Sequence, residues 1–185
     1  MKVWEEQIKN CVYHEVGHWI VAKCLNFETA SISLELEIKD EVLQVKNART
    51  HILYHPSLPS LSNVMKYILE RSTVGLSGIM CQHILLNVDI KKAIEAFGSD
   101  DYEKAQELSL IYRGVKYPND QSYTSENEQR GELILKAFTL SNEIINKKID
   151  EIKIVSECIL HEINNAEGKF DFSLLQLDGW YAKKD

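Results

Sequence analysis

The sequence has few of the residues that interrupt regular structure, with three prolines and eight glycines among 185 residues. This composition excludes collagen-like repeats and proline-rich disorder. No apolar stretch approaches the roughly 20 residues of a membrane span. Residues 1–10 resemble neither a signal peptide nor a transit peptide. We therefore expect a single soluble, cytoplasmic domain over residues 1–185, with no membrane segment.

Basic runs and paired cysteines are missing as well. The chain carries 21 Lys and Arg against 28 Asp and Glu, a formal net charge of −7. Because no segment gathers positive charge, nucleic acid and anionic lipid are not expected as partners. The cysteines form no CxxC pair, which predicts buried thiols rather than disulfides or a zinc ribbon. They are Cys11, Cys24, Cys81 and Cys158.

Helical periodicity is the dominant pattern that is present. Apolar residues recur every three or four positions in segments that we expect to be helices: 3–25, 61–86, 101–113 and 128–164. The last segment is either one long helix or a broken pair. Its apolar stripe, Ile144 to Ile163, is interpreted as a core face or as a helix–helix contact between copies of the chain, and both interpretations stay open.

One segment has the period of a strand instead. Residues 32–38 alternate apolar and polar side chains, and residues 42–46 can form the hairpin partner. Residues 51–62 and 114–129 are expected to be loops. The sequence therefore predicts an α+β, mainly α-helical fold with one small β-hairpin. Its first part spans residues 1–50 and its helical remainder residues 61–165.

The chemistry-bearing motif is His14-Glu15-Val16-Gly17-His18, an HExxH pattern inside the first predicted helix. Residues i and i+4 share one helix face, so His14 and His18 can converge on one Zn²⁺. Glu15 lies close enough to reach a water at that metal without ligating it, and can act as general base. The alternative is an accidental pattern on a solvated or packed helix face.

A catalytic zinc needs a third protein ligand and an open position. The best candidate segment is residues 97–105, at the start of a predicted helix. There Asp100 and Glu103 suit the N-cap and N3 positions, which leaves Asp101 free to ligate. The competing interpretation, that both aspartates only stabilise the helix start, carries equal weight on these residues alone.

Residues 12–18, V-Y-H-E-V-G-H, resemble the (A/C)-x-H-E-A-G-H opening of the peptidase domain of FtsH-type ATP-dependent zinc metalloproteases. Residues 98–105, G-S-D-D-Y-E-K-A, are similar to that family's G-A-S-N-D-L-x-x-A-T, one residue shorter after the glycine. Residues 73–82 resemble its L-A-G-R-A-A-E helix, with Ile79 in place of the Arg and Gln82 in place of the Glu. The order of elements also agrees over most of the chain.

This resemblance implies a zincin-like peptidase domain. It implies zinc ligation by His14, His18 and Asp101, and a general base at Glu15, with Asp100 on the family's Asn. If the alignment is off by one residue, Asp100 is the third ligand instead. The family's domain normally follows a membrane segment and an AAA+ ATPase, and the chain has no GxxxxGK[ST] phosphate loop. We therefore expect a stand-alone peptidase for flexible or unfolded polypeptides, or one that a separate partner supplies. A homo-oligomer is possible.

Two further expectations concern substrate and mechanism. Residues 32–38 could offer a sheet edge to an extended peptide, or could only cover the core. Tyr54 or Tyr102 could stabilise an oxyanion, and nothing in the sequence selects between them. Two other classes of protein stay open: a catalytically silent zinc-binding adaptor, and a metal-free helical interaction module.

Overall fold

The computed structural model describes residues 3–120 and 122–183. The elements in chain order are α1 (Val3–Cys24), β1 (Glu28–Lys39), β2 (Val42–Leu53), α2 (Leu61–Leu86), α3 (Ile90–Ala93), a π-helical turn η1 (Ile94–Gly98), α4 (Ser99–Lys116), α5 (Tyr123–Lys147), α6 (Ile149–Ile163), β3 (Gly168–Phe172) and α7 (Leu174–Tyr181). Helices dominate beside an antiparallel sheet, so the predicted α+β, mainly helical fold is confirmed. Among the described residues, no helix is both long enough and apolar enough to cross a membrane.

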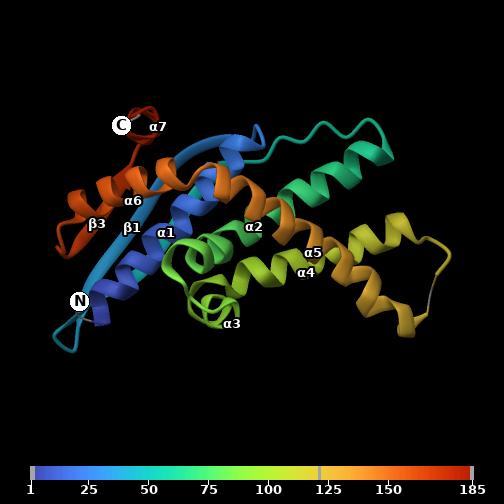
Figure 1. The fold of residues 1–185 in the computed structure, drawn as a ribbon, viewed down its shortest axis with the longest axis horizontal. Helices are drawn as coiled ribbons and strands as arrows, with labels where there is room; N and C mark the ends of the chain where they lie inside the picture. Colours follow the sequence, from blue (N-terminus) through green and yellow to red (C-terminus); the bar gives the residue numbers. More distant parts are fainter. Residues whose placement is uncertain (1–2, 121, 184–185) are drawn as a thin grey trace.

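Helix α1 is the centre of the fold. It lies along the strands of the sheet and contacts α2 and α6 on its other sides (Figure 1). Residues 11–22 of this helix are all buried, as expected for a helix enclosed on every side. The polar side chains of the HExxH motif are therefore held inside the protein.

The sheet has the order β2-β1-β3. Its two long strands form the predicted hairpin, but both extend further than the alternating pattern indicated. The short strand β3, which the sequence analysis missed, pairs with residues 32–36 of β1. Strand β1 is thus central, and the expectation that residues 32–38 offer a free edge is wrong. Strand β2 lies at the edge of the sheet instead.

Helix α2 begins and ends where its periodicity predicted. The Ser60 side chain accepts a hydrogen bond from the Asn63 N–H, and Asn87 ends the helix in the left-handed conformation. Two glycines allow α1 and α2 to approach closely. A Cβ added at Gly17 would lie 2.7 Å from the Cβ of Cys81, and one at Gly78 would lie 2.6 Å from the His14 ring. The glycines thus mark close helix packing.

Helix α4 starts differently from the prediction. It follows directly from the π-helical turn, its N-cap is Gly98, and that cap makes no side-chain hydrogen bond. The assignment of Asp100 as N-cap is therefore wrong, because the preceding helical turn places Asp100 inside the helix. The carboxylate of Asp101 still points away from the helix start, towards α1.

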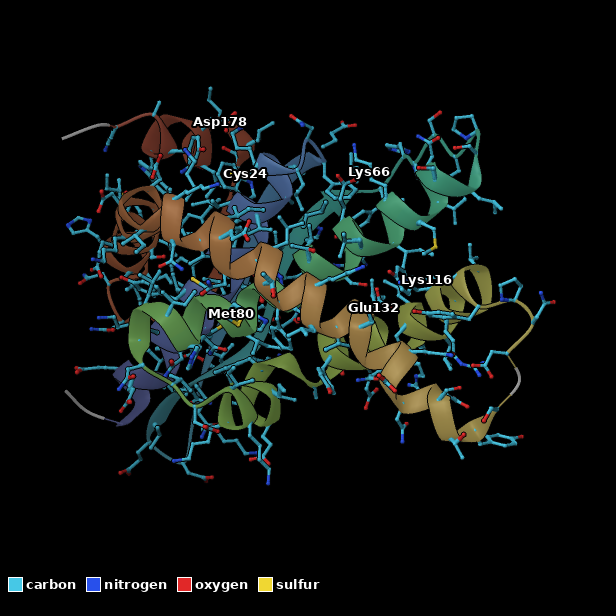
Figure 2. The ribbon with its side chains drawn as sticks, turned by 45° about the vertical axis from the view of Figure 1, so that its right-hand side comes forward. Cys24, Lys66, Met80, Lys116, Glu132 and Asp178 are labelled. Atoms are coloured by element: carbon cyan, nitrogen blue, oxygen red, sulfur yellow. The ribbon has the colours of Figure 1, made fainter. Side chains whose placement is uncertain are left out.

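The predicted loop over residues 114–129 is also wrong. Helix α4 continues to Lys116 and α5 begins at Tyr123, so a short turn joins them. The polar residues at the two ends of the predicted loop belong to the helices instead. Figure 2 labels Lys116 on α4 and Glu132 on α5, whose side chains form an ion pair.

Helices α5 and α6 form a broken pair, separated at Lys148. The apolar stripe on α6 faces the core, with Ile152, Val155 and Ile159 fully buried. The core interpretation of the stripe is therefore confirmed. All four cysteines carry free thiols; Cys11 and Cys81 are buried, and the other two are half-buried.

Candidate metal centre

Two histidines one turn apart on α1 face α4 across the interior. The side chains of His14 and His18 are almost fully buried, and their Nε2 atoms lie 2.9 Å apart. The absence of a side chain at Gly78 makes room for the His14 ring. The helical spacing and this packing together fix both rings in place.

Each histidine is oriented by its other ring nitrogen. His14 Nδ1 donates to Gln82 Oε1 at 3.1 Å, and the Gln82 amide is itself oriented because its Nε2 donates to the carbonyl of Asn10 at 3.2 Å. His18 Nδ1 donates to the carbonyl of Val74 at 2.7 Å, because a carbonyl can only accept. With each Nδ1 carrying this proton, each Nε2 presents a lone pair when its ring is neutral and carries the second proton when its ring is an imidazolium.

Asp101 of α4 completes the cluster. Its Oδ2 lies 3.2 Å from His14 Nε2 and 3.1 Å from His18 Nε2. Ligand atoms about 2.0–2.1 Å from a tetrahedral Zn²⁺ are roughly 3.3 Å from one another, close to these separations. The three residues are thus a group that could hold a metal ion. Its fourth side opens into a cavity.

The electrostatics of this cluster favour a cation at its centre. Burial on its own would lower the pKa of His18, but the Asp101 carboxylate raises it to about 9. Burial disfavours the charged form of Asp101, yet the two histidines hold the pKa of this carboxyl well below its usual range. Three acceptor atoms that face one point require a proton or a metal ion between them.

Glu15 lies beside this cluster and outside it. Its side chain is buried, with 8% of its surface exposed, and it lines the same cavity. Thr50 of β2 holds it: the Thr50 hydroxyl lies 2.7 Å from Glu15 Oε2 and 2.8 Å from the Glu15 carbonyl. Thr50 therefore orients the Glu15 carboxylate, which is not one of the three groups that face the candidate metal position.

The cavity has a volume of about 450 Å³. It is lined by the three candidate ligands, by Phe97 and by residues 48–54 of the hairpin, together with Arg71 and Lys104. Tyr54 lies in its wall, whereas Tyr102 lies in a separate groove between α4 and α5. Asp100 also lines the cavity, but it is exposed and is not part of the metal-facing group.

Sequence reasoning missed four contributors to the site: Gln82, the Val74 carbonyl, Thr50 and Arg71. Gln82 had a signal, because it falls within the segment similar to the family's L-A-G-R-A-A-E helix. The others had none, because a backbone carbonyl, a strand threonine and a helix arginine carry no recognisable spacing.

Comparison with models of known protein families finds no match for this chain, and comparison with curated protein sequences finds none either.

Proposed function

We propose that this chain is a zinc metallopeptidase that hydrolyses peptide bonds in flexible or unfolded polypeptides. The observation that carries the proposal is the convergence of two buried imidazole nitrogens, His14 Nε2 and His18 Nε2, with Oδ2 of the partly buried Asp101 beside a cavity. Two imidazoles and one carboxylate with an open fourth side are the ligand set of a catalytic zinc.

The ligands and the base have separate roles. Zn²⁺ bound there would supply a Lewis acid that polarises the scissile carbonyl and lowers the pKa of a water. Glu15 accepts the proton of the water that adds to the carbonyl, and later donates it to the departing amine. Thr50 holds the Glu15 carboxylate, and Gln82 and Val74 hold the histidine rings.

Tyr54 is the side chain that we propose as oxyanion donor, since it lies in the cavity wall and Tyr102 does not. Burial raises the pKa of Tyr54 above its ordinary value, so its phenol keeps the proton that it must donate. The backbone of β2 around residues 48–53 runs along the same cavity and lies at the sheet edge, where an extended peptide can add as a strand.

The motifs in residues 12–18 and 98–105 support a peptidase domain of the FtsH-type class. Such a domain acts on substrates that are already unfolded, or on those that a separate partner delivers. A homo-oligomer is compatible with this proposal. The four free thiols are in keeping with a reducing compartment such as the cytoplasm.

The test is Glu15→Gln measured with zinc-loaded protein. We expect zinc binding to be retained and hydrolysis of an unfolded protein to fall by about 10²–10⁴-fold, the contribution of a general base. Glu103→Gln is the matched control, since Glu103 is exposed and does not line the cavity. If wild type and Glu15→Gln bind zinc and are equally inert, the peptidase proposal fails and a silent zinc-binding adaptor is favoured.

A further inference from the structure

Three cationic side chains line the cavity around the metal-facing cluster: Arg49 of β2, Arg71 of α2 and Lys104 of α4. They come from three separate elements, although the chain as a whole has a net charge of −7. Within residues 3–120 and 122–183, none of the three forms an ion pair with a carboxylate. Their charges are therefore available to a ligand in the cavity.

Arg71 is held in place before any ligand binds. Its guanidinium carbon lies 3.9 Å from the centre of the Tyr54 ring, and Tyr54 in turn packs edge-on against Phe27 at 5.3 Å. Arg71 is half-buried in this position. A stacked guanidinium loses little conformational freedom on binding and still presents its N–H groups at its edge, where a carboxylate can accept two hydrogen bonds.

The acids of the cavity do not neutralise these cations once a metal is bound. Asp101 faces the two histidines and Glu15 faces Thr50, which leaves Asp100 at the exposed rim. With neutral histidines, the three acids and three bases of the lining cancel. A divalent cation at the cluster then gives the cavity a formal charge of about two positive units, which favours anionic ligands.

Resting on the proposed function, we infer that Arg71 binds a carboxylate of the polypeptide that occupies this cavity, with Arg49 and Lys104 adding positive charge. The carboxylate has two possible sources with the same chemistry, an Asp or Glu side chain near the scissile bond or the free C-terminus of the chain. The peptidase thus selects acidic segments or chain ends. Arg71 is the specificity-determining residue, and Tyr54 positions it.

Two sets of fluorescent peptides test this inference. In the first, one Glu is replaced by Gln at successive positions, and in the second a free C-terminal carboxylate is replaced by an amide. For each peptide, kcat/KM is measured with zinc-loaded wild type, and Kd is measured by anisotropy with the zinc-loaded Glu15→Gln protein. We expect one carboxylate to be preferred over its amide by about tenfold or more, as for a charge-assisted hydrogen bond.

Arg71→Gln should remove that preference while leaving the amide peptides nearly unaffected. Lys153→Gln is the matched control: it makes the same change in charge at an exposed position of α6, away from the cavity, and should keep the preference. The first peptide set responds if the source is a side chain and the second if it is the C-terminus. The wild-type preference should also shrink between low salt and 0.5 M salt, because added ions screen charge.

The inference would be overturned if carboxylate and amide peptides had equal kcat/KM with wild type and equal Kd with the Glu15→Gln protein, whatever the Arg71 variant does. A carboxylate preference in Kd without hydrolysis would leave the Arg71 site standing and would sink the peptidase proposal. Hydrolysis with no carboxylate preference would do the reverse.

Discussion

Two clusters of charged and polar side chains, one around Glu132 and one around Asp101, differ in how their hydrogen-bond donors and acceptors are matched. Between α4 and α5, the Glu132 carboxylate accepts from Lys116, from Lys136 at 2.7 Å and from the Tyr117 hydroxyl at 2.8 Å. The Tyr112 hydroxyl is a fourth donor at 3.4 Å, so one acceptor group meets four donors. Between α1 and α4, three atoms that can all accept face one another, and only a second proton on a histidine ring or a bound cation can pair them.

Burial sharpens the contrast. The Glu132 side chain is 26% exposed and its Lys136 partner 49%, whereas the side chains of His14 and His18 are 2% and 9% exposed and that of Asp101 is 24% exposed. An exposed and satisfied cluster contributes a little stability, because solvent screens it. A buried cluster of facing acceptors is costly unless a cation occupies it. The comparison teaches that unmatched acceptors, rather than charge density, distinguish the proposed metal site.

The comparison is tested most strongly at the neighbouring aspartates of α4. Asp101→Asn should weaken zinc binding strongly, because it removes a charged ligand. Loss of a residue that only hydrogen-bonds a ligand weakens metal binding by about 10–100-fold, and the effect here should be larger. Asp100→Asn is the matched control, and it should bind zinc as wild type does, since its exposed side chain lies outside the metal-facing group. Competition with a chromophoric chelator measures both, and the reverse order would move the third ligand to Asp100.

Gly78→Ala tests the space that the His14 ring needs. The added Cβ would lie 2.6 Å from that ring, so we expect about 1–3 kcal/mol of destabilisation from overpacking, together with weaker zinc binding. Gly131→Ala, in α5 with no atom within 4 Å of its added Cβ, should instead stabilise by up to about 1 kcal/mol. Urea unfolding and zinc titration of both variants check this, and a neutral Gly78→Ala would contradict the packing described.

Gln82 tests whether orientation of the histidine matters. Gln82→Leu removes the acceptor for His14 Nδ1 and should weaken zinc binding by about 10–100-fold. Gln82→Glu keeps an acceptor there and should restore most of the affinity. Equal zinc affinities for Gln82→Leu and wild type would mean that packing alone holds the ring.

The Glu132 cluster should show the smallest effect and no effect on zinc. Hydrogen bonds from Lys116 and Lys136 lower the pKa of Glu132 to about 2. Because this folded-state pKa lies below the ordinary value of 4.5, the stabilisation is present above pH 4.5 and is lost as the pH falls towards 2. Glu132→Gln should cost about 0.2–1 kcal/mol at pH 7, after screening, and less at pH 3. Urea unfolding at the two pH values measures it.

The sequence predicted correctly those elements that are determined by residues close to one another in the chain. The three-to-four periodicity placed α2 correctly, and the HExxH spacing placed both histidines on one face of α1. The loop predicted over residues 114–129 is too long, because the polar residues at the end of α4 and in the first turns of α5 have the composition of a loop. Strand β3 was not predicted, because its five residues pair with a strand that lies more than 130 positions earlier in the chain.

The residues of the candidate site also fall into those that a local motif predicts and those that only tertiary packing brings in. One short motif predicted His14, His18 and Glu15, and a second motif predicted Asp101. The two motifs lie far apart in the sequence and come together only in the folded chain. The supporting contacts from Gln82, Val74 and Thr50 depend on how α2 and β2 pack against α1. Such contacts are tertiary, so no local pattern encodes them.

The most direct test of the central claim is zinc anomalous scattering from crystals of the zinc-loaded wild type. We predict one peak per chain, about 2.0–2.2 Å from His14 Nε2, His18 Nε2 and an Asp101 carboxylate oxygen, with Glu15 not ligating. A peak at other side chains, or no ordered zinc between α1 and α4, would contradict the account.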